Sequence, residues 1–326
     1  MTTPITTRLH DRGLTLTNLG KVLYPATGTT KAEVVSYYLD VAATVLPHLA
    51  GRCVTRVRFP QGVGGYSFYE KNRPSGAPDW LVSQRVESSE GGVDYPVITE
   101  PAALVYLANL AALELHAPQW TLQHATLRDQ SVVLDPPDEP RATTCVLDLD
   151  PGPEAGLEAL VTAALLVATR VAADGLVPYL KTTGSKGLQI SCPISPTRAE
   201  TVVRYAAQVS AELARQRPDL FVTTIAKDAR QGRIYLDTLV NKAARSCVCA
   251  YSLRGRDRPA VATPISFEEL AAAAGPEDLR FSPDQVLERV ARHGDLFAPV
   301  LAEGPSLPVA DEPPAVRPQR RRCNQP

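Results

Sequence analysis

Apolar and polar residues alternate along residues 147–150, and this period of two predicts that residues 143–150 form a β-strand. Residues two apart on a strand point to the same face of a sheet. Leu147 and Leu149 are therefore expected to face the core. Asp148 and Asp150 then lie side by side on the opposite face, and the Pro-Gly pair that follows ends the strand.

The same reading predicts the other elements of the chain. Apolar residues three and four positions apart indicate helices over residues 30–49, 101–116, 154–173 and 195–215. Capping patterns open the first of these and two short helices, at residues 30–33, 266–269 and 282–283. Strands are expected over residues 14–18, 53–59, 66–69 and 131–134, in a strand–turn–strand unit over residues 179–193, and before Asp237. We expect a loose arm at residues 1–13.

The bulk properties of the chain leave its class open. Its 326 residues are enough for a large core, in one big domain or in two modules. The net charge of −1 does not indicate a nucleic-acid partner, so local charge clusters matter more. With no apolar run that could span a bilayer and no signal-peptide core, we expect a cytoplasmic protein without a membrane partner. The six scattered cysteines lack zinc-site spacing and read as reduced thiols.

The paired carboxylates of Asp148 and Asp150 are the first candidate for chemistry. Two carboxylates this close repel each other unless a positive charge lies between them. Mg²⁺ or Mn²⁺ prefers such oxygen ligands. The alternative is an edge strand that carries two solvated aspartates. Residues 146–152 alone leave both interpretations open.

Two segments are candidates for binding phosphate. In the turn over residues 182–187, two glycines allow backbone N–H groups to converge on an anion, and Thr183, Ser185 and Lys186 add donors. An ordinary hairpin turn is the alternative. Near the N-terminus, Lys21, Lys31 and the free N–H groups at the start of the helix after Thr30 are suited to a second phosphate, although two solvated lysines would explain the spacing equally well.

Basic residues cluster in two regions. Residues 52–73 hold five Lys or Arg against one Glu, and exposed Phe68 or Tyr69 beside Arg58 and Lys71 would suit base stacking next to phosphate contacts. The alternative is a hairpin with its aromatic rings in the core. Residues 227–258 hold eight Lys or Arg against three Asp, which suits a polyanion site. His116 is expected to cap the C-terminus of the helix over residues 101–116.

Several of these segments together carry a family resemblance. They are Asn18-Leu-Gly-Lys21-Val-Leu-Tyr-Pro, Lys31, Phe68-Tyr-Glu-Lys71, Leu113-Glu-Leu-His116, Leu147-Asp-Leu-Asp150-Pro-Gly, Thr183-Gly-Ser-Lys-Gly-Leu188, Leu236-Asp237 with Asn241, and Tyr251-Ser-Leu-Arg254. In this order, over about residues 10–300, the set resembles the polymerase domain of bacterial ligase D, which belongs to the archaeo-eukaryotic primase superfamily. Since no ligase or nuclease segment is present, the chain looks like a stand-alone relative of the kind that actinobacteria carry.

The resemblance implies a fold. It is an α/β (α+β) archaeo-eukaryotic primase fold, with central, mostly antiparallel or mixed sheets flanked by helices. Residues 1–300 would form a single primase-polymerase catalytic domain, made of an N-terminal α/β module and an RRM-like catalytic module. Residues 303–326 are rich in Pro and Arg and are expected to form a disordered tail.

The resemblance also implies roles for individual residues. The catalytic residues would hold two divalent ions, Mn²⁺ or Mg²⁺; they are Asp148, Asp150 and Asp237. The NTP or dNTP substrate would contact His116, Thr183, Ser185, Lys186, Gln189 and Arg254. A 5′-phosphate on the downstream strand would bind Asn18, Lys21 and Lys31. The remaining DNA contacts would be Phe68 and Tyr69 at the template turn, Arg58 and Lys71 on the backbone, and Arg230 and Asn241.

Two positions depart from the family pattern. The family usually has His where this chain has Gln189, and glutamine can donate to a phosphate but cannot carry a positive charge. Where the family commonly has Asn-x-Arg-Gly-Lys, this chain has Asn241-Lys-Ala-Ala-Arg245, so a loop glycine is lost.

The implied function is a template-directed DNA or RNA nucleotidyltransferase that fills short gaps with a downstream 5′-phosphate during DNA repair and prefers ribonucleotides. One alternative is a polymerase for end joining of broken DNA, acting with Ku and a separate ATP-dependent DNA ligase. Others are a non-catalytic module that binds DNA ends and a primase that starts chains de novo. A cytoplasmic, nucleoid-associated location follows from a DNA substrate.

Overall fold

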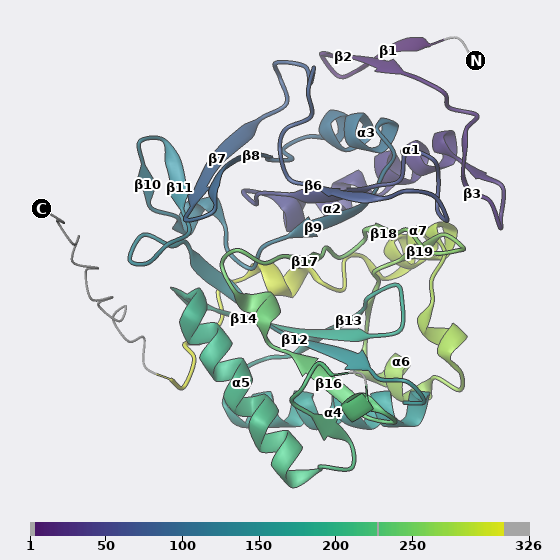
Figure 1. Ribbon diagram of the computed structural model, residues 1–326. Coiled ribbons are helices and arrows are strands. Elements are labelled where there is room, and N and C mark those ends of the chain that lie inside the picture. The colour runs from purple at the N-terminus through teal and green to yellow at the C-terminus, as the bar shows by residue number, and fades with distance from the viewer. Residues whose placement is uncertain (1–3, 227, 310–326) are drawn as a thin grey trace, which may run out of the picture.

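The computed structural model describes residues 4–226 and 228–309. Its upper part in Figure 1 is built on a four-stranded sheet in the order β17-β9-β5-β6, from β5 (Thr55–Arg58), β6 (Phe68–Glu70), β9 (Ala112–Ala117) and β17 (Cys247–Val248). Helices α1 (Lys31–Asp40), α2 (Ala42–Leu49) and α3 (Pro101–Asn109) pack with this sheet around one hydrophobic core. The capping box at Thr30 and Glu33 is confirmed.

The lower part in Figure 1 is built on a six-stranded sheet in the order β15-β16-β12-β14-β13-β20. Its strands are β12 (Arg141–Pro151), β13 (Tyr179–Thr182), β14 (Leu188–Arg198), β15 (Phe221–Val222), β16 (Ile234–Asp237) and β20 (Pro264–Ile265). Neighbouring strands are antiparallel except β15 and β16. The helices α4 (Leu157–Ala173) and α5 (Ala199–Gln216) pack on it around a second core. This mixed α/β architecture, with mostly antiparallel sheets flanked by helices, confirms the expected fold class.

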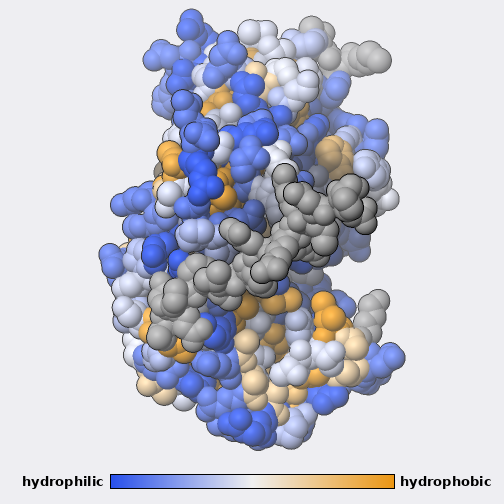
Figure 2. Space-filling model, turned by 60° about the vertical axis from the view of Figure 1, so that its left-hand side comes forward, coloured by the Kyte–Doolittle hydropathy of each residue, from blue (hydrophilic) through white to orange (hydrophobic). Residues whose placement is uncertain are grey.

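Smaller elements complete the fold. A four-stranded sheet in the order β10-β11-β7-β8 contains β7 (Ser83–Ser88), β8 (Gly91–Pro96), β10 (Leu127–Arg128) and β11 (Ser131–Val133). Two-stranded pairs join β3 (Val22–Tyr24) to β4 (Thr29–Thr30) and β18 (Leu253–Arg254) to β19 (Ala260–Val261). Helix α6 (Phe267–Ala272) begins at the predicted capping box, and α7 (Pro283–His293) begins at the predicted Ser282-Pro283 start. On the face seen in Figure 2, hydrophilic residues predominate in the upper part.

Four sequence predictions about elements are wrong. The helix predicted over residues 30–49 is two helices, α1 and α2, which are separated at Val41. Residues 101–116 do not form one helix, because α3 ends at Asn109, Ala111 adopts φ +59°, and the chain then pairs with β5 as β9. Alternation of apolar and polar residues in that segment, completed by pairing to β5, outweighs the helix propensity of Ala, Leu and Glu. His116 therefore lies on a strand and caps no helix.

The two predicted termini also differ. Residues 5–16 form a hairpin of β1 (Ile5–Leu9) and β2 (Arg12–Leu16) rather than a loose arm. At the other end, the Ser195 N–H donates to the Pro305 carbonyl at 3.1 Å, and Leu307 packs against the second core. The tail therefore does not start at residue 303, and residues 310–326 lie outside the described part of the chain. No helix within the described ranges has the length and apolar character needed to cross a membrane.

Candidate active site

The three predicted catalytic carboxylates come together on the six-stranded sheet. Asp148 and Asp150 lie on β12, while buried Leu147 and Leu149 face the second core, as the alternation predicted. Asp237, at the end of β16, is the direct register partner of Asp148. Side chains directly opposite each other on antiparallel strands share a face, so two distant segments deliver acids to one place.

The row continues across the next two strands. Gln189 on β14 is the register partner of Asp148, and Lys181 on β13 is the register partner of Gln189. The Gln189 Nε2 donates to Asp148 Oδ2 at 3.0 Å, and the Lys181 ammonium donates to Gln189 Oε1. Asp237, Asp148, Gln189 and Lys181 therefore form one row of side chains across four strands, which we call the cross-strand row.

The electrostatics of this row favour a bound cation. Burial, and then the charge of Asp150, raises the pKa of Asp148 to about 7, with a further contribution from Asp237. Asp148 Oδ1 is buried without a hydrogen-bond partner among the described residues. Burial also raises the pKa of Asp150, although the charge of Arg230 opposes this. A buried, unpartnered oxygen beside two like charges is the arrangement that a divalent ion relieves.

The ligand cage itself is not closed. Among the residues that the structure describes, no three His, Cys, Asp or Glu side chains are grouped so that they could hold a metal ion as they stand. Asp237 Oδ1 accepts the N–H of Leu239 at 2.8 Å, which ties this carboxylate to the turn after β16. Charge and burial at Asp148 and Asp150 therefore favour a cation, while the Asp237 carboxylate is engaged by the backbone of its own turn.

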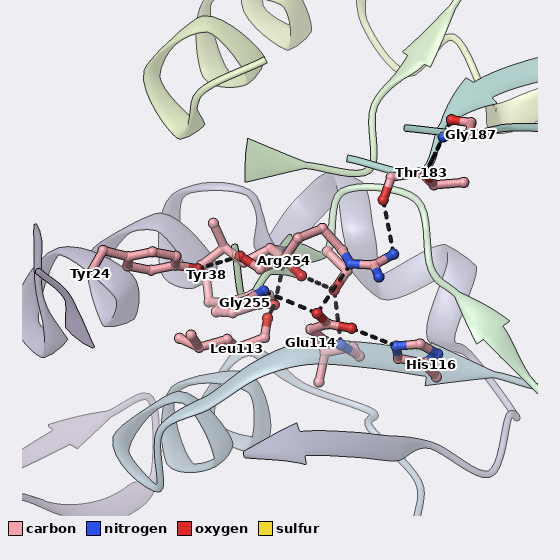
Figure 3. A network of polar contacts seen from close by, with 12 residues as sticks. Tyr24, Tyr38, Leu113, Glu114, His116, Thr183, Gly187, Arg254 and Gly255 are labelled. Atoms are coloured by element: carbon pink, nitrogen blue, oxygen red, sulfur yellow. Dashed lines mark hydrogen bonds and ion pairs between the residues drawn. The ribbon is translucent and has the colours of Figure 1, made fainter. Parts of the chain in front are cut away.

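Arg254, Glu114 and His116 form an ionic cluster (Figure 3). Arg254 Nε lies 3.2 Å from Glu114 Oε1, and Arg254 Nη1 donates to the Thr183 carbonyl at 2.9 Å. Glu114 Oε2 lies 2.9 Å from His116 Nε2. Burial opposes ionisation of Glu114, but the hydrogen bond to His116 and the charge of Arg254 outweigh it and lower the pKa of Glu114 to about 2. Arg254 thus links the strand β9 to the loop after β13.

The predicted phosphate loop is a tight hairpin turn with inward-facing donors. The Thr183 hydroxyl accepts the Gly187 N–H at 3.2 Å and lies 3.1 Å from the Gly187 carbonyl oxygen. Gly184 adopts φ +64°, and a Cβ there would lie 2.7 Å from the Arg254 side chain, so only glycine fits. Ser185 is half-buried and Lys186 is exposed. The loop is therefore closed by internal hydrogen bonds, and its charged donor, Lys186, remains exposed.

Most of these groups border one cavity of about 930 Å³. Its walls come from both sheets and from the β7–β8 hairpin. The predicted site residues that line it are Tyr69, Lys71, His116, Asp148, Asp150, Thr183, Ser185, Lys186, Gln189 and Arg254. Asp237, the third predicted carboxylate, is not among the lining residues. Asp148 and Asp150 thus share one open space with the cationic side chains of Lys186 and Arg254, as a metal-bound triphosphate would require.

The predicted template residues point to opposite faces of the upper sheet. Tyr69 is 68% exposed, and its ring lies edge-on to His116 with centroids 5.8 Å apart. Phe68 faces the other side, where its ring stacks with Tyr66 at 5.6 Å and lies beneath the Arg58 guanidinium at 5.4 Å. Arg58 also pairs with Glu70 at 3.1 Å. Of the two neighbouring rings, only Tyr69 lines the cavity.

The predicted 5′-phosphate residues lie near the start of α1, outside the cavity lining. Lys31 is only 5% exposed, and its Nζ donates to the Asn109 carbonyl at 2.9 Å. Burial, and then the charge of Lys21, lowers the pKa of Lys31. Lys21 donates to the Gln61 side chain at 3.3 Å, and Asn18 is exposed. The two ammonium groups are thus electrostatically coupled.

One part of that prediction is wrong. The N–H groups that open the helix are not free: those of Lys31 and Ala32 donate to the carbonyls of Lys21 and Leu19, and that of Glu33 donates to the Thr30 hydroxyl. These N–H groups are satisfied by the turn that precedes the helix and by the capping box. Any anion here must be bound by side chains.

The last two predicted DNA-binding residues support the carboxylate strands. The Arg230 guanidinium donates to the Asp150 carbonyl at 3.3 Å and covers the Tyr235 ring at 5.2 Å. Asn241 is 1% exposed, and its amide accepts the Val146 N–H at 2.8 Å and donates to the Val146 carbonyl at 2.7 Å. Asn241 therefore pairs with the edge of β12 like an additional strand residue.

Comparison with known proteins identifies the family. The model of the LigD primase-polymerase domain matches residues 30–297. The chain belongs to the LigD primase-polymerase family. Members of this family are nucleotidyltransferases, which agrees with the enzyme class that the motifs implied.

Individual relatives support the assignment. The chain is 39% identical over 312 residues to the multifunctional non-homologous end joining protein LigD of Mycolicibacterium smegmatis, covering 95% of this chain and 39% of that protein. It is 31% identical over 288 residues to the bifunctional LigD of Bacillus subtilis, covering 87% of this chain and 43% of that protein. The chain thus spans about two fifths of the length of these relatives. The polymerase domain from Mycobacterium tuberculosis ligase D in complex with DNA superposes with a TM-score of 0.82 at 39% identity, covering 90% of this chain and 99% of that chain.

Sequence reasoning missed two residues of this LigD primase-polymerase site. Glu114 pairs with both Arg254 and His116, and Lys181 holds Gln189. The polar positions of the alternation Leu113-Glu-Leu-His116 put Glu114 on the face of His116, so a correct strand assignment would have found it. For Lys181, the predicted hairpin over residues 179–193 already places it on the strand facing Gln189, but its link to Asp148 depends on the pairing of β14 with β12.

Proposed function

We propose that the chain is a template-directed DNA or RNA polymerase that fills short gaps bearing a 5′-phosphate on the downstream strand. The observation that carries the proposal is the cavity that Asp148 and Asp150 line together with the cations Lys186 and Arg254. That charge arrangement matches a metal-bound nucleoside triphosphate next to a primer 3′-hydroxyl.

The acids supply the metal chemistry of this proposal. Asp148, Asp150 and Asp237 would hold two divalent ions, and we propose Mn²⁺ over Mg²⁺. Such ions, when bound, lower the pKa of the attacking hydroxyl and neutralise the leaving pyrophosphate. The unpartnered Asp148 Oδ1 and its raised pKa support a cation at this position.

The cationic side chains orient the nucleotide. Lys186 is exposed at the turn and able to reach a phosphate, and Arg254 is held in place by Glu114. Thr183 and Ser185 shape the loop between them. His116, next to Glu114 and Tyr69, is suited to a polar contact at the sugar or base. A preference for ribonucleotides is proposed on the same basis, through polar contacts to the 2′-hydroxyl.

The 5′-phosphate is proposed to bind Lys21 and Lys31 beside Asn18. The two ammonium groups influence each other, and burial destabilises the charge on Lys31, so an anion between them would be stabilising. Tyr69 and Lys71, at the cavity wall, would contact the template strand. We propose that the polymerase works in the cytoplasm, at the nucleoid.

Extension of a one-nucleotide gap tests the proposal. The substrate carries a 5′-phosphate or a 5′-hydroxyl and is assayed with each nucleotide set and with Mn²⁺ or Mg²⁺. Asp148→Ala or Asp237→Ala should abolish extension while DNA binding is kept. The double variant Lys21→Ala with Lys31→Ala should weaken binding only to the phosphorylated gap. Full extension by an aspartate variant would refute the catalytic assignment, and equal weakening on both gaps would refute the phosphate pocket.

A second candidate is end joining of broken DNA. It is favoured by the names of the relatives, which are non-homologous end joining proteins. In this case the polymerase would act with Ku and a separate ATP-dependent ligase. Faster extension across two 3′-overhanging ends than on a gap would support it. A non-catalytic end-binding module would give no primer extension with Mn²⁺, and a primase would extend without any primer.

A further inference from the structure

The cross-strand row assigns Gln189 a task other than phosphate binding. Gln189 and Lys181 are each 2% exposed. A buried amide and a buried ammonium are costly unless their hydrogen bonds are satisfied. Within the described ranges, the hydrogen bond of Lys181 Nζ is to Gln189 Oε1, and the hydrogen bond of Gln189 Nε2 is to Asp148 Oδ2.

Chemistry fixes the direction of this chain of hydrogen bonds. An ammonium group has donors only, so the end of the Gln189 amide next to Lys181 must be the oxygen. The NH₂ group then points at Asp148, where the carboxylate can only accept. Lys181 thus dictates how the Gln189 amide is turned, and Gln189 engages one oxygen of Asp148 and leaves the other, Oδ1, without a partner.

The neighbouring acids have different supports. Asp150 lies near the charge of Arg230, and Asp237 is held by the Leu239 N–H. Of the three acids, Asp148 is the one whose hydrogen bonds, within the part of the chain that the structure describes, include a side chain from β14. Because register places Lys181, Gln189 and Asp148 directly opposite one another, no loop movement is needed to maintain the contact.

We propose that Gln189, oriented by Lys181, is a positioning residue that fixes the Asp148 carboxylate with Oδ1 available to the metal ion. The inference rests on the proposed metal site. Loss of an outer hydrogen-bond partner of a metal ligand typically weakens metal affinity about 10- to 100-fold. The proposal therefore concerns metal affinity first and catalysis only through it.

The test is Mn²⁺ affinity, measured by electron paramagnetic resonance of free Mn²⁺ without nucleotide or DNA. Gln189→Met, which keeps the length of the side chain and removes its hydrogen bonds, should weaken Mn²⁺ binding about tenfold. Lys181→Met should weaken it in the same direction, because the Gln189 amide is then free to turn over. The nucleotide KM at saturating Mn²⁺ should stay within about twofold in both variants.

A rescue variant covers the case in which Gln189→Met does not fold. A neutral histidine offers one donor and one acceptor nitrogen, so Gln189→His can accept from Lys181 and donate to Asp148. It should keep Mn²⁺ affinity within about threefold of the wild type, with an unchanged thermal melt. A Gln189→His variant that folds normally but loses Mn²⁺ affinity overturns the inference.

Two results separate this inference from the proposed function. Asp148→Asn is the reference, and if it leaves Mn²⁺ affinity unchanged, the proposed metal site is wrong. If Asp148→Asn weakens Mn²⁺ binding but folded Gln189→Met does not, the metal site stands and the positioning role is overturned. If Gln189→Met raises the nucleotide KM and leaves Mn²⁺ affinity unchanged, Gln189 contacts the phosphate of the nucleotide instead.

Discussion

At the scale of single residues, the site depends on ionisable groups held in unfavourable surroundings. Asp148 carries its charge next to Asp150 in a buried position, and Glu114 carries its charge between Arg254 and His116. The first arrangement is destabilising without a cation, and the second is satisfied within the protein. The two acids should therefore respond in opposite ways to pH and to substitution.

Asp148 makes the metal-free protein less stable as the pH rises. Its folded pKa of about 7 exceeds the ordinary value, so the folded state binds more protons than the unfolded state between about pH 4 and pH 7. Stability is thus lost as the pH rises through that window. Asp148→Asn should raise the free energy of unfolding at pH 8 by up to about 4 kcal/mol and have little effect at pH 4. Urea denaturation in EDTA at both pH values measures this, and equal effects at both would contradict it.

Glu114 should act through Arg254. Glu114→Gln keeps the size of the side chain but removes the charge that holds the guanidinium, so the nucleotide KM should rise about tenfold with a smaller change in kcat. The matched control is Glu90→Gln, which alters a carboxylate in the wall of the same cavity, on the β7–β8 turn. Steady-state kinetics at saturating Mn²⁺ provide the measurement. A similar KM for the two variants would show that the ion pair with Arg254 does not matter.

At the scale of elements, the sequence predicts strands well where alternation is uninterrupted and poorly where helix formers alternate with polar residues. Strand β12 and its paired aspartates follow directly from the pattern at residues 143–150. Strand β9 does not, because Ala, Leu and Glu favour a helix and only pairing with β5 makes the segment a strand. Because the segment was predicted as a helix, Glu114 was not recognised as a neighbour of His116 in the site.

Strand pairing sets a further limit on prediction. The hairpin predicted over residues 179–193 brings Lys181 and Gln189 near each other, but nothing local in the sequence says that they continue a row from Asp148, because the register between β12 and β14 is decided between segments that lie far apart in the chain. The family resemblance supplied Asp237 and Arg254, and alternation alone would have supplied neither. Residues that act through neighbours are therefore the ones that sequence reasoning misses.

The pairing of Asn241 with the edge of β12 leads to a prediction about stability. Its amide satisfies the N–H and the carbonyl of Val146, so Asn241→Ala leaves two buried backbone groups without partners. The free energy of unfolding should fall by about 3 kcal/mol. Affinity for gapped DNA, measured by fluorescence anisotropy below the melting temperature, should stay within twofold. If the variant has normal stability but binds DNA more weakly, Asn241 contacts the DNA instead.

At the scale of the whole molecule, two large cores and a smaller third cluster that contains Trp120 lie around one cavity. The first core contains residues between Leu14 and Ala117 and, later in the chain, between Cys249 and Val261 and between Val286 and Val300. The second contains residues from Ala142 to Leu236 and again Ile265 to Leu279. The chain passes from one core to the other several times. Segments of the same core are therefore separated along the sequence by segments that belong to the other core.

This interleaving predicts that the two cores unfold together, as expected for one catalytic domain. Trp80 packs against the first core and Trp120 belongs to a smaller third cluster, whereas circular dichroism at 222 nm reports on helices of both large cores, among them α4 and α5 of the second. Of the two signals, tryptophan fluorescence and circular dichroism, only circular dichroism therefore samples the second core directly. Their thermal melts should coincide, because unfolding of either core pulls out segments that the other core requires. The ion pair between Arg254 and Glu114, with the bond from Arg254 to Thr183, couples the two sheets directly. Two melts separated by several degrees would mean two independent domains, and the cavity would then be a mobile interface whose acids and cations meet only when substrate closes it.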